Sequence, residues 1–534
     1  MIRVEHLREG VPPIPATAVV VPRRAEEIAR PADRFGADER TALARQIEEQ
    51  LAQRTPHVAV IDAVRSLSEP GACAVVTGQQ PGLLAAPLYS LYKALHAIAL
   101  ARHLRRLWST PVVALFWNHA DDHDIAEVHH ANLVNRNLDV QKITLAGVSS
   151  GRQPFSRIVL DEPTHHLAAI RALLAQIVEG TPFAERAVDL FAARPGETLA
   201  SAFTRSLTDL LGRAGLVVLE PDWIRPQMSA HLARLAACDP LGALEKGAAR
   251  LKAQGQEPAI EPAGAALFYL LDTNGRRALR AGGDGFRFDG EAGSRTGPEL
   301  AAEIVQDPAA WSPGALLRPV VQDLCLPVAA YVGGMGELAY HVELPELRAS
   351  VGAPATPFVP RVSCTLVDPE CRVSLGRVGT TVAEILRARG VGEPEGDGAQ
   401  GASTEPAVIA RMRAIADAGA RELEALRDDL AALDAGLLSQ LKRAAGQMRS
   451  AGEWVAEKAE RVHQNKSGKG RRHLRRLASS LFPLGEPQER ILGPLPFVAR
   501  FGEDWPIELL KSIDPFAPEH LVVNLGSDLE GDAT

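Results

Sequence analysis

The sequence predicts an α/β protein in which a parallel sheet carries inserted segments and a long helical arm. Residues 74–117 read as strand, glycine loop, helix and strand, the order of a βαβ unit, whose strands pair in parallel with a right-handed crossover. No proline occurs between Pro406 and Pro483, although 38 of the 534 residues are proline, and leucines recur there at heptad spacing.

Composition excludes several protein classes. Hydrophobic residues make up 46% of the chain and charged residues 23%, and 58 Lys+Arg against 66 Asp+Glu give a net charge of −8. At roughly 150 residues per domain, this length supplies about three and a half units. Disorder, collagen and a disulfide scaffold are excluded. The mildly acidic balance gives no electrostatic reason to expect nucleic acid or an anionic membrane as a partner.

The cysteines and the apolar segments predict a cytoplasmic protein. Five cysteines, an odd number without a C-x-x-C pair, fit reduced thiols. The first ten residues contain no hydrophobic region of the kind a signal peptide needs. Apolar runs such as 18–21 and 112–117 are far shorter than the ~20 residues that span a bilayer.

The first βαβ unit is the best defined part of the body. Residues 74–76 and 111–117 are apolar runs, and the segment 87–108 between them carries leucine and isoleucine at helical spacing. Further apolar runs with β-branched or leucine content predict additional strands at 215–219, 265–271, 327–332 and 359–362.

The proline-free segment predicts an antiparallel pair of long helices. Gly446 and the stretch 450–452 mark the expected bend. The predicted seam consists of Leu423, Leu426, Leu430, Leu433, Leu437, Leu441 and Met448.

Glycine-rich and turn-rich stretches on either side of this arm predict the domain boundaries. Residues 389–404 are too polar and too rich in glycine to pack a core, and apolar residues return after Pro496 and need a surface to cover. We therefore expect a catalytic core with insertions (1–388), a flexible linker (389–404), an antiparallel coiled-coil arm (405–482) and a C-terminal segment that docks back on the core (483–534).

The first candidate site is the loop formed by Thr77, Gly78, Gln79, Gln80, Pro81 and Gly82. In a parallel sheet, this junction lies at the carboxyl ends of the strands, where the following helix offers free N–H groups to an anion. Its glycines let a ligand approach the backbone closely, and its glutamine amides can both donate and accept hydrogen bonds. Neither the Walker A nor the Gly-x-Gly-x-x-Gly pattern is present. A tight turn with a helix cap explains the spacing equally well.

The second candidate site follows the second strand of the same unit. Four histidines and four carboxylates occur within residues 119–130, and clustered carboxylates must be solvated, paired or bound to metal. Substrate or nucleotide binding with acid–base work is one interpretation. A site for Zn, Mn or Fe is chemically allowed, although no His-Glu-x-x-His spacing is present. The third interpretation is a solvated cluster on the protein surface.

The third candidate segment is Arg318-Pro-Val-Val-Gln-Asp323, followed by residues 331–341, which begin with the string Tyr331-Val-Gly-Gly-Met-Gly-Glu337. This string reads as a glycine-rich loop between a strand and a helix, which could hold a sugar or phosphate through backbone amides. Glu337 could receive an amine or a hydroxyl, although a turn followed by a favourable first-turn glutamate explains the pattern as well. The basic run 461–476 is typical of a solvated helical face, and the alternative is a mobile loop at 465–470 that reaches a phosphate.

Several motifs follow one another along the chain. They are Val76-Thr-Gly-Gln-Gln-Pro-Gly-Leu83 with Pro87-Leu-Tyr-x-x-Tyr-Lys93, Trp117 with Asp122-His-Asp124 and Glu127-Val-His, Arg318-Pro-x-x-Gln-Asp323, Tyr331-Val-Gly-Gly334 with Gly336-Glu337 and Tyr340, Pro360-Arg361, and Leu481-Phe-Pro483 with Gln488-Glu-Arg490. In this order, from about residue 1 to residue 512, the sequence resembles the BshC family, the cysteine ligases assigned to bacillithiol biosynthesis.

The resemblance implies a Rossmann-type parallel sheet core related to class I aminoacyl-tRNA synthetase-like ligases, with inserted connecting segments and a long α-helical coiled-coil arm that makes a homodimer. It implies a carbon–nitrogen ligase that adds L-cysteine to glucosaminyl malate by an amide bond in the last step of the pathway, with ATP activating the cysteine carboxylate. The expected partners are these small molecules and a second copy, with no nucleic acid and no membrane. Asp121 stands where Glu is usual, and Met335 interrupts the glycine string, so Asp121 is left out of the catalytic set.

On this hypothesis, His123, Asp122 and Asp124 are catalytic and position or deprotonate the attacking amine, because amide formation requires a neutral amine. No metal site is assigned. Substrate and nucleotide are expected to bind at Thr77, Gly78, Gln79, Gln80, Gly82, Tyr331, Gly333, Gly334, Glu337, Tyr340 and Arg361. The alternative function is a metal-dependent hydrolase that uses the His/Asp cluster, with His119, Asp122, His123 and His129 as ligands.

Overall fold

The computed structural model describes residues 2–7, 19–31, 34–148, 151–282, 285–289, 291, 293–391, 407–434, 436–464, 469–517 and 519–526. The chain folds into two compact units. Unit 1 comprises Met1–Glu370, Val382–Gly390 and Ser479–Thr534, and unit 2 comprises Cys371–Thr381 and Val391–Ala478.

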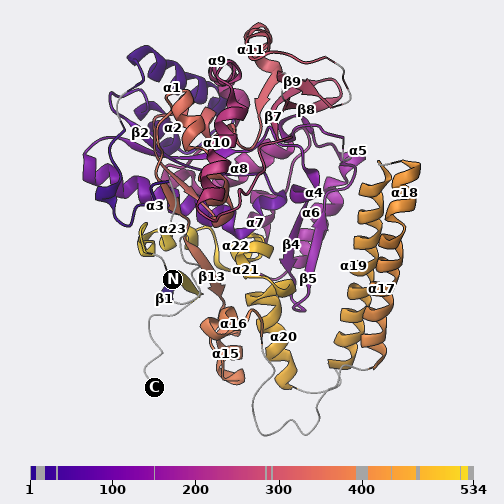
Figure 1. The fold of residues 1–534 in the computed structure, drawn as a ribbon. Coiled ribbons are helices and arrows are strands. Elements are labelled where there is room, and N and C mark those ends of the chain that lie inside the picture. The colour runs from indigo at the N-terminus through magenta and orange to yellow at the C-terminus, as the bar shows by residue number, and fades with distance from the viewer. Residues whose placement is uncertain are drawn as a thin grey trace. The chain divides into compact units, whose positions relative to one another are not determined.

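A five-stranded parallel sheet forms the centre of unit 1 (Figure 1). Strand β2 lies in the middle; the chain adds β3 and β6 on one side and then returns to add β11 and β12 on the other. This reversal between β2 and β11 is the switch point of a Rossmann-type sheet, and the predicted fold class and its βαβ unit are confirmed. The order is β12 (Phe358–Pro360), β11 (Val328–Gly333), β2 (Cys73–Gln79), β3 (Val112–Asn118) and β6 (Val217–Leu219).

Helices cover both faces of this sheet. Val75 and Phe116 belong to an apolar core shared with α3 (Leu88–Trp108) and α8 (Leu199–Leu211). Val76 belongs to a second core, which includes side chains of α1 (Ala37–Ala52), α2 (Val58–Ser66), α9 (Arg225–Ala237) and α12 (Arg318–Cys325). Because neighbouring strand residues point to opposite faces, a sheet that is covered on both faces needs the continuous apolar runs seen in the sequence.

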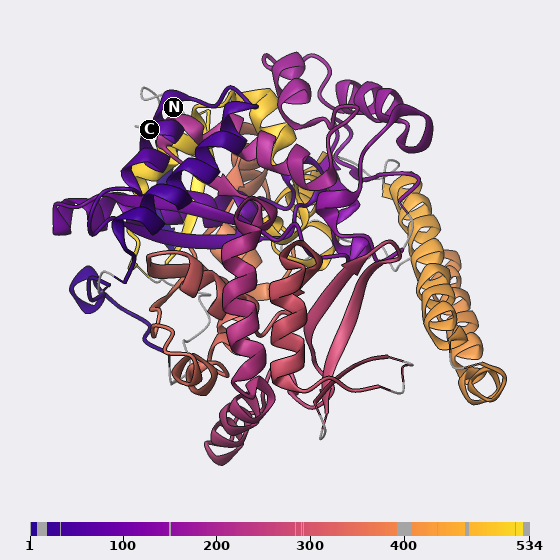
Figure 2. The ribbon, with the colours of Figure 1, turned by 90° about the horizontal axis from the view of Figure 1, so that it is seen from above.

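A second, antiparallel sheet is also part of unit 1, and Figure 2 shows its strands beside α9 and α11 (Gly297–Gln306). The apolar run 265–271 forms a strand of this sheet, not of the parallel one. The reason is the tight hairpin that follows, in which the Asn274 N–H donates to Asp272 and Gly275 has φ of 104°. Such a hairpin joins antiparallel neighbours, whereas parallel strands need a long crossover. The order is β10 (Trp311–Pro313), β7 (Ala266–Asp272), β8 (Gly275–Gly282) and β9 (Gly285–Phe288).

Strands from both ends of the chain meet in a third sheet of unit 1. β14 (His520–Leu525) pairs antiparallel with β1 (Ile2–Leu7) and parallel with β13 (Ser363–Val367). A separate hairpin joins β4 (His130–Val134) to β5 (Val140–Thr144). The third sheet therefore ties residues more than 500 positions apart in the sequence, such as Ile2 and Leu525.

The other α-helices of unit 1 connect these sheets. They are α4 (Ile125–Val128), α5 (Glu162–His165), α6 (Leu167–Ile177), α7 (Ala184–Phe191), α10 (Pro240–Ala253), α13 (Met335–His341), α14 (Pro345–Ser350), α16 (Val382–Ala388), α21 (Gln488–Ile491), α22 (Leu495–Phe501) and α23 (Trp505–Leu509). Among the residues that the structure describes in either unit, no helix is long and apolar enough to cross a membrane.

Unit 2 contains the coiled-coil arm. Helix α17 (Ala407–Ala425) packs along α19 (Leu437–Gln464), and α18 (Arg427–Leu433) lies between them in the sequence. The predicted bend at Gly446 and 450–452 is wrong, because α19 continues through both positions. Gly452 serves close helix packing instead. A Cβ placed on it would lie 2.1 Å from the Cβ of Ala416 on α17.

Two short helices complete unit 2. Most of α15 (Pro369–Val378) belongs to it, and the Ser374 hydroxyl lies 3.0 Å from Nδ1 of His473 on α20 (Lys469–Leu481). Most of the expected linker, residues 392–404, lies outside the described residues, as do residues 465–468 of the basic run.

His96, on α3 in unit 1, makes stability dependent on pH. Its Nδ1 accepts the Val362 N–H at 2.8 Å, so its proton lies on Nε2 and is donated to the Pro515 carbonyl at 3.0 Å. Burial lowers the pKa of His96 to about 4. The unfolded chain therefore binds a proton below about pH 6.5 that the folded chain does not accept until about pH 4.

We expect His96 to lower the free energy of unfolding by up to about 3 kcal/mol as the pH drops from 6.5 to 4. Urea unfolding at several pH values measures this slope in the wild type and in His96→Asn. The variant should lose that part of the slope, whatever its own stability. An equal slope in both proteins would contradict the assignment.

Candidate functional site

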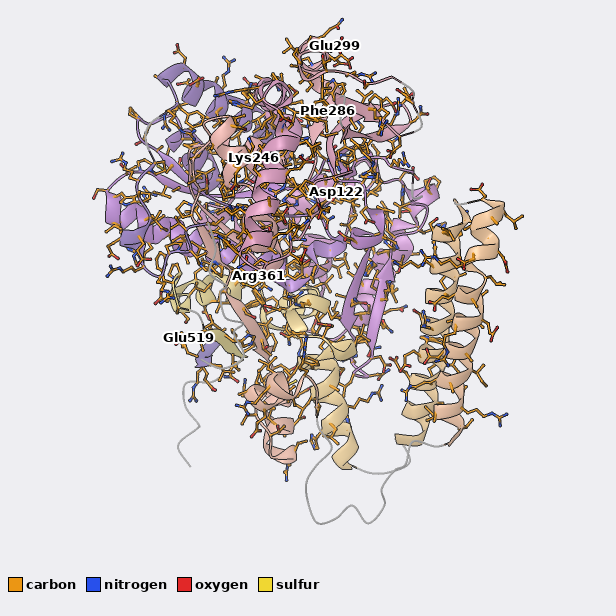
Figure 3. All side chains as sticks on the ribbon, in the orientation of Figure 1. Asp122, Lys246, Phe286, Glu299, Arg361 and Glu519 are labelled. Carbon is orange, nitrogen blue, oxygen red and sulfur yellow. The ribbon has the colours of Figure 1, made fainter. Side chains whose placement is uncertain are left out.

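The carboxyl ends of β2, β3 and β11 lie side by side at the switch point of the parallel sheet. Gly78 pairs with Trp117 of β3, and Thr77 pairs with Val332 of β11, so the loops that follow the three strands leave the same edge. Ligands bind at this edge in open parallel sheets. The three segments singled out in the sequence therefore meet at one place, which includes Asp122, labelled in Figure 3.

The sequence suggested that the loop after β2 leads directly into a helix N-terminus. The structure shows that it does not. A short 3-10 turn, Leu83–Ala85, intervenes, and the first amide of α3, at Leu88, donates to the Leu492 carbonyl at 2.8 Å. Gly82 is required by this turn, since a Cβ there would lie 1.9 Å from the Ala86 carbonyl oxygen. The Leu88 amide is therefore not one of the free N–H groups that the sequence predicted for an anion at this helix start.

Lys93, on α3, is the centre of the buried part of the site. Its ammonium donates to the Gly78 carbonyl and to Oε1 of Gln79, both at 2.8 Å, and forms an ion pair with Glu337. The Lys93 side chain is 3% exposed, and these three acceptors use all three of its N–H donors. The Gln79 amide also donates to the Tyr89 hydroxyl at 3.2 Å. Lys93 thus ties the ends of β2 and β11 together.

Glu337, on α13, completes this buried group. Its carboxylate accepts the Tyr331 hydroxyl at 2.6 Å and the Gly334 N–H at 2.8 Å, besides pairing with Lys93. Burial opposes ionisation, but Lys93 and these hydrogen bonds hold the pKa of Glu337 below its usual value. Burial lowers the pKa of Lys93, and the Glu337 charge acts against that shift. Both carboxylate oxygens are occupied by protein donors.

Arg318 and Tyr340 lie next to this pair. The Arg318 guanidinium donates to the Tyr340 hydroxyl at 3.0 Å and to Oε1 of Gln322 at 3.2 Å. Burial raises the pKa of Tyr340 to about 12, so its hydroxyl keeps its proton at neutral pH. Arg318 therefore faces neutral oxygen atoms rather than a carboxylate at these two contacts.

His119, directly after β3, is neutral. Burial and the charges of Arg318 and Lys93 lower its pKa well below the usual value. Its buried Nε2 atom has no hydrogen-bond partner among the described residues. A Cβ on Gly78 would lie 2.7 Å from this atom, so glycine leaves room for the imidazole.

Asp122 and His123 form the accessible part of the site. Asp122 accepts from the Gln80 amide at 2.7 Å and from the Arg276 guanidinium at 3.3 Å, which also lies 3.4 Å from Nδ1 of His123. Burial opposes ionisation, but His123, Arg276 and Gln80 hold the pKa of Asp122 well below its usual range. Arg276 stacks over the Tyr269 ring at 3.7 Å. The antiparallel sheet thus supplies two side chains to the strand ends.

Two of the predicted site residues have structural roles instead. Thr77 is fully buried, and its hydroxyl donates to the Val332 carbonyl at 2.7 Å, which links β2 to β11. Asp124 is exposed and caps α4, where it accepts the Ala126 N–H at 3.2 Å. Both side chains thus have structural partners, and their proposed roles in binding and catalysis stay predictions.

The remaining predicted residues are placed as follows. Gly333 packs against Phe358, where a Cβ would lie 2.6 Å from the ring. Arg361 pairs with Glu489 at 2.7 Å and stacks over Tyr89 at 5.4 Å. Asp121, left out of the catalytic set, is buried in an ion pair with Arg225. The glycine and the two ion pairs support the frame of the site.

A metal centre is not built by the described residues. No group of three or more His, Cys, Asp or Glu side chains among them is arranged to hold a metal ion. Of the ligands considered for a hydrolase, His129 bonds to the Ile125 carbonyl at 2.7 Å and stacks edge-on against His130. The structure gives no support to the hydrolase alternative.

Sequence reasoning did not assign Lys93, Arg276 or Arg318 to the site, although Arg318 begins the third candidate segment. Lys93 carried a signal, because it is the only charged residue in a buried stretch, 88–101, of an otherwise apolar helix apart from His96. Arg276 carried none, since it lies about 150 residues from Asp122 in the sequence and reaches it only through the inserted hairpin.

Comparison with known proteins covers most of the chain. The model of the N-terminal Rossmann-like domain of bacillithiol biosynthesis BshC matches residues 22–362, and the model of the BshC C-terminal coiled-coil domain matches residues 401–525. A putative arginyl-tRNA synthetase structure from Campylobacter jejuni aligns with 89% of this chain and 98% of its own at 10% identity, but its TM-score of 0.23 is too low to indicate a shared fold.

Three curated relatives carry the name "Putative cysteine ligase BshC". The protein of Koribacter versatilis is 30% identical over 92% of this chain and 90% of its own length. That of Solibacter usitatus is 29% identical over 86% of each. That of one Thermus thermophilus strain is 32% identical over 83% of this chain and 87% of its own.

Proposed function

The chain belongs to the BshC family, and from this premise we propose that it is the ligase that joins L-cysteine to glucosaminyl malate through an amide bond in the last step of bacillithiol biosynthesis. Its relatives are named cysteine ligases of that family. The amide product, the sugar substrate and the use of a nucleotide are our proposal.

The observation that supports this most is the Asp122–His123 pair at the switch point. The side chains of His123 and Asp122 are 27% and 32% exposed, whereas Lys93 beside them is almost fully buried. A substrate can therefore reach the pair. The Gln80 amide and the Arg276 guanidinium fix the pair in place, which is what orientation of a reacting group requires.

Cationic side chains around the pair suit anionic substrates. Both amino acid and sugar substrates carry carboxylates, and Lys93, Arg276 and Arg318 meet near the ends of β2, β3 and β11. In our proposal, ATP is a co-substrate that converts the cysteine carboxylate into a mixed anhydride. The glucosamine nitrogen then forms the new bond to the acyl carbon, and the phosphate-bearing group leaves with its electron pair.

The attacking amine must be neutral, because an ammonium ion has no lone pair to donate. The nearby cations disfavour a further positive charge and so favour the neutral amine. Nδ1 of His123 lies 3.5 Å from Oδ1 of Asp122 and 3.4 Å from the Arg276 guanidinium, so this side of the ring is held by the protein and Nε2 is left for the substrate. In our proposal, Asp122 orients the imidazole through Nδ1, and Nε2 of His123 accepts the proton that the amine nitrogen loses as the amide bond forms.

The test is direct product formation. Purified protein is incubated with L-cysteine, glucosaminyl malate and ATP, and mass spectrometry detects the amide product while nucleotide analysis separates AMP from ADP. His123→Ala should lower the rate by about 10²-fold or more, in line with loss of a positioned hydrogen-bonding group. His6→Gln, an exposed histidine paired with Glu519, is the matched control and should keep the wild-type rate.

Two outcomes would contradict the proposal. A folded His123→Ala variant with full activity would remove His123 from the mechanism. A wild-type protein that binds neither cysteine nor glucosaminyl malate in calorimetry would remove the proposed substrates.

We also propose that two copies pair through the coiled coil in the cytoplasm. Large apolar side chains on α17 and α19 are exposed, among them Val408, Ile415 and Trp454. Exposed apolar side chains that form one contiguous patch mark surfaces that a partner covers. Light scattering on the full chain measures the mass in solution.

A further inference from the structure

Arg318 differs from the other cations of the site in its partners. It begins α12 and donates to the Tyr340 hydroxyl and to the side-chain amide oxygen of Gln322. No Asp or Glu of the described residues lies within ion-pair distance of it. The guanidinium has five N–H donors, and these two neutral acceptors leave its charge without a counter-charge in contact.

The carboxylate of Glu337, near Arg318, is already occupied. Glu337 receives hydrogen bonds from Tyr331 and Gly334 and pairs with Lys93. Arg318 is half-buried and no carboxylate of the described residues contacts it, so its remaining N–H donors can meet an anionic ligand. Arg318 is therefore placed to receive an anion from outside the protein.

Arg276 and Arg361 show the opposite arrangement. Arg276 contacts Asp122, and Arg361 pairs with Glu489 in two parallel hydrogen bonds of 2.7 and 2.9 Å. These two cations have carboxylate partners from the chain itself. Arg318 therefore differs from Arg276 and Arg361, whose charges are paired with carboxylates of the chain itself.

His119 adds a second polar atom that lacks a partner. Its Nε2 atom is buried and makes no hydrogen bond to any described residue. Buried polar atoms in folded proteins are nearly always hydrogen-bonded, to protein, water or ligand. The imidazole packs against Gly78, whose carbonyl accepts from Lys93, the partner of Glu337, and the Arg318 charge contributes to the lowered pKa of His119. With its proton on Nε2, the neutral ring can donate to an oxygen.

We propose that Arg318 and His119 form a subsite for a substrate carboxylate, with Tyr340 and Gln322 holding the guanidinium in place. Arg318 donates to the two carboxylate oxygens through its planar fork, and His119 donates to one of them. The planar geometry of a guanidinium matches a carboxylate. The subsite rests on the proposed function for its two possible ligands, the α-carboxylate of cysteine and a carboxylate of the malate group.

Calorimetry with matched ligands tests the subsite and identifies the carboxylate. L-cysteine is compared with cysteamine, which lacks the carboxylate, and glucosaminyl malate is compared with methyl glucosaminide, which lacks malate. Each of these ligands, and ATP, is titrated into the wild type, Arg318→Gln and Arg318→Lys. Arg280→Gln, an exposed arginine paired with Asp289, is the control and should bind all ligands as the wild type does.

We expect Arg318→Gln to weaken binding of one carboxylate ligand by about 10- to 100-fold, the range for a hydrogen-bonded charge. Binding of its carboxylate-free analogue and of ATP should change by less than about twofold. Arg318→Lys keeps the positive charge but lacks the planar guanidinium, so its affinity for that ligand should lie between those of the wild type and Arg318→Gln. If Arg318→Gln does not fold, as circular dichroism would show, His119→Gln provides the same comparison.

Failure of the subsite differs from failure of the proposed function. If the wild type and the folded variants bind both substrates equally, the subsite is wrong and the proposed function stands. If the variants instead bind ATP more weakly than the wild type does, Arg318 contacts the nucleotide and the subsite is again wrong. If the wild type binds neither substrate, the proposed function falls and the subsite falls with it.

Discussion

Replacing Lys93 by methionine is expected to destabilise unit 1 by about 3–5 kcal/mol, the usual effect of removing one partner of a buried ion pair. The Lys93 and Glu337 side chains are 3% and 16% exposed, so the carboxylate would be left buried without its counter-charge, with only the Tyr331 hydroxyl and the Gly334 N–H as donors. The Gly78 carbonyl and the Gln79 amide oxygen would lose their donor as well. Urea unfolding of the full chain measures the change.

The matched control is Lys246→Met on α10. Lys246, labelled in Figure 3, is exposed, and removal of its charge should change the free energy of unfolding by no more than about 0.5 kcal/mol. The double variant Lys93→Met with Glu337→Gln removes both charges and should recover part of the loss. A loss below about 1 kcal/mol in the single variant would show that the pair contributes little.

Activity should fall further than stability alone explains. Lys93 holds the end of β2 through Gly78 and Gln79, and Gln80, the next residue, orients Asp122. A shift of this loop would move the accessible Asp122–His123 pair, and small displacements of reacting groups lower rates strongly. The double variant should therefore remain slow even where it is folded, because it lacks the same anchor.

Local pattern was sufficient to predict the parallel core. The run 74–76, the helical spacing after residue 87 and the run 111–117 specify a βαβ unit within about 45 residues, and right-handed parallel pairing leaves few alternatives. The run 265–271 shows where this reasoning ends. A short apolar run specifies a strand but not its sheet, and here the Asn274–Gly275 turn selects an antiparallel neighbour.

The helical arm shows a different limit. Glycine in a helical pattern signals either a turn or a close contact between helices, and sequence alone does not distinguish the two. At Gly452 the close approach of Ala416 shows that the glycine serves a contact between helices and not a turn. The helices are instead interrupted after Ala425 and between Leu433 and Leu437.

The site was predictable only where its residues follow strands directly. Gln80, Asp122 and Glu337 come shortly after the ends of three strands that the apolar runs located. The roles of Thr77 and Asp124 could not be assigned in the same way, because a hydroxyl or carboxylate at a strand end can also bond to the backbone. Arg276 depends on the placement of an inserted sheet, which no local pattern specifies.

Glu489 links the C-terminal segment to the frame of the site. Its carboxylate accepts from Arg361, from the Ser363 hydroxyl at 2.9 Å and from the Cys364 N–H at 3.2 Å. Burial opposes ionisation, but Arg361 holds the pKa of Glu489 below its usual value. Arg361 in turn stacks over Tyr89, which accepts from Gln79. The sequence suggested a binding role for Arg361, and these contacts suggest a structural one.

A double-mutant cycle decides between these roles. Glu489→Leu leaves Arg361 buried without its counter-charge and is expected to cost about 3–5 kcal/mol of unfolding free energy, and Arg361→Leu should cost a similar amount. The double variant replaces the pair by apolar side chains and should recover most of that loss, as such replacements often do. Glu486→Leu, at an exposed position three residues earlier, is the control and should be near neutral.

Substrate binding by the double variant then separates stability from recognition. If Arg361 only supports the frame, the folded double variant should bind glucosaminyl malate and cysteine within about threefold of the wild type, because Lys93 and Glu337 still hold the ends of β2 and β11. If Arg361 contacts a substrate, binding should fall by about tenfold or more although stability has recovered, which is the effect of losing one charged hydrogen bond. We expect the first result, since two hydrogen bonds already commit the Arg361 guanidinium to Glu489.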